Sequence, residues 1–309
     1  MKHFPVLLSE SIDYLNFVPD GIYVDGTLGR AGHTKEIASR LTSGKLIAID
    51  SDDEAIREAG EVTKSFEDKI IFIHDNFRNL ANILKDLSID SVHGMLFDLG
   101  VSSPQLDDKS RGFSYMQDSK PDMRMDRRNT LTAQSIVNDM SEDALRKIFF
   151  EYGEERYSRQ IAKKIAIERA KSQIETTKQL SEIIFSAIPA QARRENQHPA
   201  KRIFQAIRIA VNDELGAVEQ VLEDAPSLLK PQGRLCVISF HSLEDRIVKN
   251  SFREHSEGCT CSKKLPVCVC GKKPSLKIIT KKPIVAKSEE IETNPRSRSA
   301  KLRVAERLA

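Results

Sequence analysis

The 309-residue chain has no long apolar run and few cysteines, and these absences exclude several classes of protein. No stretch approaches the ~18 uncharged apolar residues of a membrane-spanning helix, so we expect no membrane partner. The apolar run at residues 1–8 is too short for a signal peptide, which predicts a cytoplasmic protein. Only five cysteines occur, and four of them lie between positions 259 and 270. This is typical of reduced thiols or metal ligands rather than of a disulfide framework.

Charge is distributed unevenly along the chain, although the net charge is only +3. Residues 107–211 carry 20 Lys and Arg against 15 Asp and Glu, and residues 255–309 carry 13 against 5. The other residues therefore hold 15 basic and 25 acidic side chains. Basic regions attached to an acidic part of the chain favour a polyanionic partner such as nucleic acid, although solvated surface lysine gives the same pattern.

A strand, a glycine-rich turn and a helix follow one another near the start of the chain. Residues 22–24 form an apolar, β-favouring run, and a helical pattern begins at Thr34. Between them lie Gly26, Gly29 and Gly32. This spacing differs from the G-x-G-x-x-G of a dinucleotide site and leaves Asp25 at the end of the strand. An acid there suits a cationic or hydroxyl-bearing ligand better than a phosphate, which argues against a nicotinamide dehydrogenase.

Acidic residues also end the second and fourth predicted strands. The second strand, residues 45–50, ends in Asp50, and the fourth, residues 92–98, ends in Asp98. Asp50 follows Gly32 by 18 residues, a position typical of a carboxylate that accepts hydrogen bonds from ribose hydroxyls. We therefore predict an adenosine-containing ligand without a pyrophosphate, and S-adenosylmethionine is the commonest of that kind.

Phe77 follows the third predicted strand, residues 70–75. Its ring could stack on a purine, or it could belong to the core. Ligands of open parallel sheets bind outside the carboxyl ends of the strands, so we expect one site at that edge. Four side chains would converge there: Asp25, Asp50, Phe77 and Asp98.

The alternation of strands and helices stops after the fourth strand. Residues 107–211 are loop-like and then helical, which predicts an inserted helical region. A helix over residues 213–229 and a strand over residues 234–240 then continue the sheet. Two later β-like runs, residues 276–280 and 301–305, could pair at its edge.

Five motifs, in this order along the chain, resemble the MraW-type ribosomal small subunit methyltransferase H family: HFPVLL at 3–8, DGTLGRAGH at 25–33, DLGVSSPQLD at 98–107, DMRMD at 122–126 and SFHSLEDR at 239–246. The resemblance covers nearly the whole chain. It implies an α/β fold, with a Rossmann-like class I methyltransferase sheet built from residues 1–106 and 212–309. Residues 107–211 would form an inserted helical substrate-recognition domain.

The resemblance also implies an activity and its ligands. Members of the family use S-adenosylmethionine to methylate the exocyclic N4 of a cytidine in the decoding region of 16S ribosomal RNA, and we expect the RNA to be presented within the small ribosomal subunit. The implied cofactor contacts are Ala31, Gly32, His33, Asp50, Phe77, Asp98 and Gln105. The family usually has glycine at the position of Ala31. The sequence leaves the oligomeric state open, a homodimer included.

The amino nitrogen of cytosine is a poor nucleophile because its lone pair is delocalised into the ring. The site must therefore align N4 with the methyl group and accept a hydrogen bond from it. The acceptor stays open among Asp98, the backbone carbonyls that follow it, and Ser102 or Ser103. Methylation at carbon 5 would need a cysteine thiolate, and Cys236 lies in an apolar strand where a core role is expected.

Other residues carry two readings each. Cys259, Cys261, Cys268 and Cys270 could bind a structural zinc ion, although their C-x-C-x6-C-x-C spacing is not the usual C-x2-C pair. His241 could contact RNA or cofactor, or cap the helix that begins after it. His198 and Pro199 mark a helix boundary.

The inserted region offers candidate RNA contacts. Phe113 and Tyr115 could stack on exposed bases. The candidate phosphate-binding residues are Arg124, Arg127, Arg128, Arg193, Arg194, Lys201 and Arg202. Two rival functions share these features: methylation of another base by the same scaffold, and a non-catalytic RNA-binding or assembly factor that keeps the cofactor fold.

Overall fold

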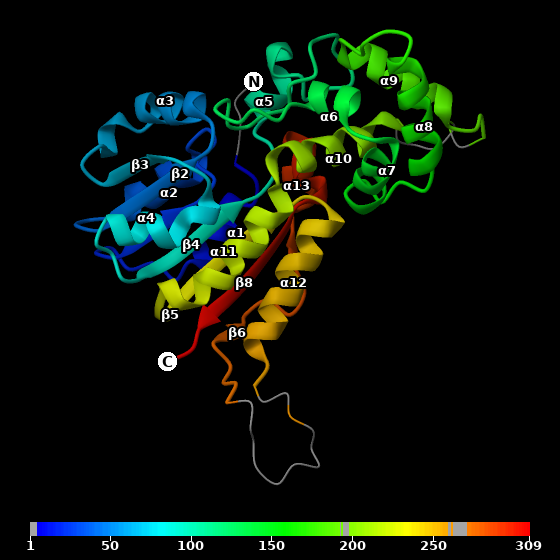
Figure 1. Ribbon diagram of the computed structural model, residues 1–309. Coiled ribbons are helices and arrows are strands. Elements are labelled where there is room, and N and C mark those ends of the chain that lie inside the picture. The colour runs from blue at the N-terminus through cyan, green and yellow to red at the C-terminus, as the bar shows by residue number, and fades with distance from the viewer. Residues whose placement is uncertain (1–4, 192, 194–197, 259–260, 262–270) are drawn as a thin grey trace. The chain divides into compact units, whose positions relative to one another are not determined.

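The structure of the protein is a computed structural model that describes residues 5–191, 193, 198–258, 261 and 271–309 (Figure 1). The chain forms two compact units. Unit 1 comprises Met1–Gly100 and Leu215–Ala309, and unit 2 comprises Val101–Glu214. These boundaries lie close to the 106/107 and 211/212 limits proposed from the sequence.

Within the described residues, unit 1 contains an eight-stranded sheet with the order β3-β2-β1-β4-β5-β8-β6 and with β7 paired to β8. The strands are β1 (Ile22–Asp25), β2 (Lys45–Asp50), β3 (Ile70–His74), β4 (Val92–Asp98), β5 (Leu229–Ser239), β6 (Leu276–Ile278), β7 (Ile284–Val285) and β8 (Lys301–Arg307). Strands β1 to β5 are parallel to one another, whereas β8 is antiparallel to β5, β6 and β7. The predicted run 301–305 therefore lies inside the sheet, between β5 and β6, and β6 forms the edge (Figure 1, β8 in red).

Helices cover both faces of this sheet because alternate residues of its strands point to opposite sides. Tyr23 and Leu46 pack in one apolar cluster with α1 and α2, whereas Val24 and Ile47 pack in another with α4, α11 and α12. The helices of unit 1 are α1 (Leu8–Tyr14), α2 (Gly32–Arg40), α3 (Asp53–Val62), α4 (Leu80–Asp86), α11 (Glu214–Leu228), α12 (Ser242–Ser256) and α13 (Ser288–Thr293). Parallel strands with helices on both faces place the functional edge at the carboxyl ends of β1, β2 and β4.

Unit 2 is helical and has an apolar core of its own. Its helices are α5 (Ser103–Asp107), α6 (Ala133–Asp139), α7 (Glu142–Glu151), α8 (Ser158–Arg169), α9 (Thr177–Ala187) and α10 (Ala200–Asn212). Ser141 caps α7 and Thr176 caps α9, because each side-chain oxygen accepts a hydrogen bond from a backbone N–H of the first turn. The hydroxyl of Thr177 donates to the carbonyl of Gln117, which ties α9 to the loop before α6. None of the described helices is long and apolar enough to cross a membrane.

Candidate active site

The turn after β1 is stabilised by Asp25, whose side chain is 1% exposed. Its Oδ1 accepts a hydrogen bond from the backbone N–H of Thr27 at 3.2 Å, and its Oδ2 accepts one from the hydroxyl of Thr34 at 2.6 Å. Burial raises the pKa of this carboxyl. Asp25 therefore holds the strand, the turn and α2 together, and its contact with a ligand stays a prediction.

Ala31 and Gly32 begin α2 in two different ways. Ala31 has a left-handed backbone with φ of 58°, and its methyl group is buried in the apolar cluster that α1 and α2 share. An alanine therefore fits where the family usually has glycine. Gly32 has no room for a side chain, because an added Cβ would lie 2.2 Å from Cγ of Pro5. The close approach that this glycine permits is thus to the chain's own N-terminal segment.

Asp50 links the end of β2 to the glycine turn. Its Oδ2 accepts a hydrogen bond from the N–H of Gly29 at 2.8 Å, and its Oδ1 accepts one from the N–H of Asp52 at 2.9 Å. Burial raises the pKa of Asp50 to about 6, with smaller contributions from the charges of Asp52 and Asp25. Each oxygen keeps a second lone pair, so the carboxylate can still accept hydrogen bonds from ribose hydroxyls.

Asp98 and His33 face each other at the same edge of the sheet. Asp98 Oδ2 lies 3.9 Å from Nδ1 of His33, and Nε2 of His33 lies 3.1 Å from the carbonyl oxygen of Val6. Burial lowers the pKa of His33 to about 4, so the ring is neutral near pH 7. The Oδ1 atom of Asp98 is buried and has no hydrogen-bond partner among the described residues.

Glu244, in the first turn of α12, is a buried carboxylate near Asp98. Its Oε2 accepts hydrogen bonds from the N–H groups of Phe240 at 2.8 Å and His241 at 3.2 Å, while Nδ1 of His241 accepts from the N–H of Glu244. The capping reading of His241 is therefore confirmed. Burial raises the pKa of Asp98 well above its ordinary range, and the charges of Asp25 and Glu244 raise it further. The sequence signal that could have identified Glu244 is its position as an acid in the first turn of the helix after β5.

Phe77 lies just beyond β3 and is half-buried. Its ring meets that of Phe97 edge-on, with centroids 5.6 Å apart. Gly26 makes room for this pair, since an added Cβ would lie 2.3 Å from the ring of Phe97. Phe77 therefore belongs to the core packing and still has part of its side chain exposed.

The remaining predicted residues lie in unit 2, at the start of α5. Ser102 is the N-cap residue, and Oε1 of Gln105 accepts a hydrogen bond from the N–H of Ser102 at 3.1 Å. Ser103 and Gln105 are both buried. These contacts show that Gln105 caps the start of α5.

The carboxylates of unit 1 form a site that lacks a cation. Asp25, Asp50 and Asp98 make no ion pair with Lys or Arg within the described part of the chain. S-adenosylmethionine carries a sulfonium and an ammonium group, which such a site attracts. The buried, unpartnered oxygen of Asp98 is a suitable acceptor for a cationic group. The residues present therefore fit this cofactor.

The predicted zinc ligands Cys259, Cys268 and Cys270 lie outside the described residues, whereas Cys261 is described and half-exposed. Within the described ranges, no group of three or more His, Cys, Asp or Glu side chains is arranged to hold a metal ion.

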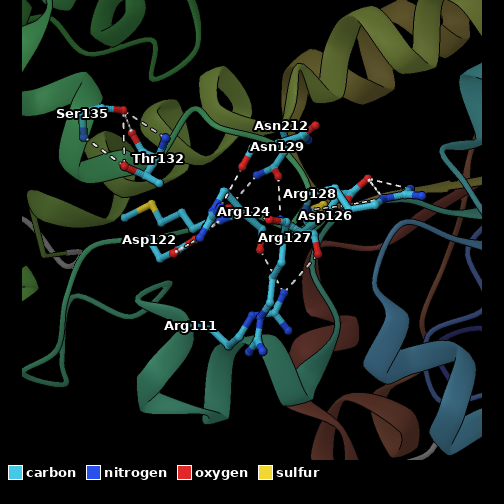
Figure 2. A network of polar contacts seen from close by, with 12 residues as sticks. Arg111, Asp122, Arg124, Asp126, Arg127, Arg128, Asn129, Thr132, Ser135 and Asn212 are labelled. Carbon is cyan, nitrogen blue, oxygen red and sulfur yellow. Dashed lines mark hydrogen bonds and ion pairs between the residues drawn. The ribbon is translucent and has the colours of Figure 1, made fainter.

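The DMRMD motif holds a loop of unit 2 in place (Figure 2). The guanidinium of Arg124 donates to the carboxylate of Asp122 at 2.7 and 2.8 Å and to the carbonyls of Arg127 and Asn129 at 3.0 and 2.7 Å. Asn212 fixes the same loop from α10, by accepting from the N–H of Met125 and donating to the carbonyl of Met123. Arg124 is therefore engaged within the protein, and the expectation that it meets phosphate is wrong.

Comparison with known proteins identifies the family. The model of the MraW methylase family matches residues 1–308, which is nearly the whole chain. The chain belongs to the MraW methylase family. The family, the class of fold, the enzyme class and the methyl donor predicted from the sequence motifs are thereby confirmed.

Relatives in the MraW methylase family match over their full length. The protein named "Ribosomal RNA small subunit methyltransferase H" of Brevibacillus brevis is 53% identical over 307 residues, covering 99% of this chain and 98% of that one. Its namesake in Clostridioides difficile is 52% identical, covering 99% of both chains. A solved structure, an rRNA methylase from Streptococcus thermophilus, is a weak likeness, with 12% identity and a TM-score of 0.44 over 100% of this chain and 99% of that one.

Proposed function

We propose that this enzyme transfers a methyl group from S-adenosylmethionine to the exocyclic N4 of a cytidine in the decoding region of 16S ribosomal RNA. The names of the full-length relatives support small-subunit ribosomal RNA as its substrate. The assembled small subunit, in the cytoplasm, is the form of substrate we propose. The single observation that carries the activity is the group of carboxylates Asp25, Asp50 and Asp98 at the carboxyl ends of β1, β2 and β4, with which no Lys or Arg among the described residues pairs.

The cofactor-binding residues come mainly from the carboxyl edge of the sheet. Asp50 would accept hydrogen bonds from the ribose, and Phe77 would offer the exposed part of its ring to the adenine. Asp98 would accept from the cationic end of the cofactor, beside His33 and the turn at Ala31 and Gly32. Gln105 lies in unit 2, and its contact with the cofactor stays what the family resemblance implies. Since these residues belong to one chain, the activity does not require a homodimer.

The methyl transfer itself depends on alignment and on one hydrogen-bond acceptor. S-adenosylmethionine, when bound, supplies a methyl group on a positively charged sulfur. Orientation of N4 could contribute ~7 kcal/mol or more to lowering the barrier, and an acceptor for the N4 proton about 3–5 kcal/mol. We assign the acceptor role to Asp98, because its Oδ1 has no hydrogen-bond partner among the described residues. Ser102 and Ser103 are the alternative acceptors.

Methylation at carbon 5 of cytosine would need a reactive thiolate, which Cys236 does not supply. Cys236 is fully buried in β5, and burial raises the pKa of its thiol to about 12. A thiol in that state does not attack a pyrimidine ring. Amino methylation needs no such nucleophile.

The test is to incubate the protein with unmethylated small subunits and tritiated S-adenosylmethionine and then to map the labelled nucleotide. The proposal expects label on the N4 of one decoding-region cytidine. Label on another base would show that the scaffold has a different substrate. Tight binding of both cofactor and subunit without turnover would instead identify a non-catalytic assembly factor. Free 16S rRNA tested in parallel separates naked RNA from the particle as substrate.

A further inference from the structure

Three aromatic side chains stack on one another at the surface of unit 2. The ring of His198 lies 5.1 Å from that of Tyr115, with 12° between their planes, and 5.9 Å from that of Phe185, with 18° between them. His198 is exposed, Phe185 is 39% exposed and Tyr115 is half-buried. We call Tyr115, Phe185 and His198 the aromatic stack.

The aromatic stack exists only in the folded unit, because its members come from distant parts of the chain. Tyr115 lies in the loop before α6, Phe185 near the end of α9, and His198 just before α10. The ring of Phe204, which is 4% exposed, meets Tyr115 edge-on at 5.8 Å and connects the stack to the core. Phe113, the other aromatic expected to meet bases, is buried in that core, so this part of the expectation is wrong. The stack is thus a surface extension of the core.

Positive charge borders the aromatic stack. The guanidinium of Arg193 lies over the ring of Phe185, 4.8 Å from its centroid, and its Nε donates to the carbonyl of Ile188. Lys201, in the first turn of α10, and Lys178, on α9, are exposed. The exposed acids near these residues along the sequence are Asp118, Glu175 and Glu182. Arginine beside exposed rings is typical of surfaces that bind single-stranded nucleic acid.

We propose that the aromatic stack binds an unpaired nucleobase of the RNA substrate, outside the methyl-transfer site. The proposal rests on the proposed function, since it takes ribosomal RNA as the partner. Stacking requires a free π-face, which an unpaired base offers and a base inside a duplex does not. The base would take the place on the Phe185 ring that Arg193 now covers, and Arg193 would turn from the ring to the phosphate beside the base.

The absence of tryptophan from the chain allows a direct test. Phe185→Trp would introduce a single indole into the aromatic stack, and a base stacked on it would quench its fluorescence. Phe150→Trp is the matched control, because Phe150 is also an exposed phenylalanine of unit 2, 64% exposed on α7. Titration with an unstructured RNA oligonucleotide should quench the indole fluorescence of the Phe185→Trp variant and leave that of the Phe150→Trp variant unchanged. A duplex of the same length should quench neither.

Loss of the rings should weaken substrate binding without changing the chemistry. We expect Phe185→Leu and His198→Ala each to raise the KM for small subunits about tenfold, with kcat and the Kd of S-adenosylmethionine unchanged, and Phe185→Trp to keep the wild-type KM. Equal quenching at both positions, or RNA binding by anisotropy without quenching at position 185, would overturn the proposal. Leucine and alanine variants that lose thermal stability but keep the wild-type KM would do the same. Quenching does not depend on turnover, so it can succeed even where the methylation assay fails.

Discussion

Asp98 Oδ2 lies 3.9 Å from Nδ1 of His33, and this histidine faces the carboxyl with a lone pair rather than a proton. Its Nε2–H donates to the carbonyl of Val6, and burial lowers the pKa of the ring to about 4. A neutral ring that faces a carboxylate with an acceptor does not stabilise the negative charge. His33 therefore leaves Asp98 with its raised pKa and without a cationic partner, so a cation from outside the protein is what this site attracts.

Asp98→Asn should weaken binding of S-adenosylmethionine by about 10- to 100-fold, because it removes the charge from a charge-assisted hydrogen bond and keeps its size. Binding of S-adenosylhomocysteine, which lacks the sulfonium charge, should weaken less. Calorimetry with both ligands measures the difference. Asp53→Asn is the control, since Asp53 is an exposed acid on α3. Unchanged binding with lost turnover would restrict Asp98 to accepting the N4 proton.

Two glycines of one motif should respond differently to alanine. Gly29 has φ of 48°, and an added Cβ would make only an ordinary contact, 3.8 Å from the carbonyl oxygen of Thr27, so Gly29→Ala should cost only the left-handed strain, about 1–2 kcal/mol of unfolding free energy. Gly32→Ala would place a methyl group 2.2 Å from Cγ of Pro5 and should cost more, because the N-terminal segment must move. Urea unfolding of both variants gives the comparison. Equal losses would contradict the packing of Pro5 on the turn.

The apolar runs in the sequence predicted the strands of the sheet. They could not predict contacts between residues that are distant in the sequence. Asp50 and Asp98 could be placed because each ends an apolar run, and parallel strands share an edge whatever the rest of the chain does. Glu244 is more than a hundred residues from Asp98, so only the pairing of β4 with β5 brings them near each other.

Contacts between distant segments also explain what the sequence did not predict about Arg124 and His198 in unit 2. Arg124 reads as a phosphate ligand in a basic motif, and only the folded loop shows its guanidinium bound to Asp122 and to backbone carbonyls. His198 reads as a helix boundary, which is confirmed, but its stacking partners come from distant segments. Residue type suggests what a side chain can do, and tertiary contacts decide which of these roles it has.

Cys236 should be dispensable for catalysis. Its thiol is buried in β5 with a pKa raised to about 12, so it is neither ionised nor accessible. Cys236→Ala should keep the wild-type turnover number and lose about 1–2 kcal/mol of stability from the small cavity. Tritium incorporation and thermal unfolding measure the two effects separately. If the variant had wild-type stability but no turnover, the result would support methylation at carbon 5 with Cys236 as the nucleophile.

Arg124→Ala should destabilise unit 2 rather than weaken a phosphate contact. It removes the bonds to Asp122 and to the carbonyls of Arg127 and Asn129, a loss of about 2–4 kcal/mol. The slope of RNA affinity against salt concentration should stay at the wild-type value. Lys201→Ala is the comparison: this exposed lysine should leave stability unchanged and reduce the slope by about 1 if it meets a phosphate. A reduced slope in the Arg124 variant would contradict its internal role.

The stability of the cofactor-free protein should carry a pH signature of Asp50. Burial raises the pKa of Asp50 from 3.8 to about 6, so the folded state holds this proton more tightly than the unfolded chain does. The contribution of Asp50 to stability is therefore present below about pH 4 and is lost as the pH rises to about 6, by up to ~3 kcal/mol.

Asp50→Asn isolates this contribution, because the variant keeps every other titrating group. His33 has the opposite effect, since its lowered pKa makes stability rise with pH between about 4 and 6.5, but it titrates in both proteins and cancels in the difference. Urea unfolding from pH 4 to pH 7 should show the wild-type protein losing stability relative to Asp50→Asn up to about pH 6, with a constant difference above it. A difference that rises with pH would mean that Asp50 is stabilised as a carboxylate by a positive charge near the site, which would contradict a site that lacks a cation.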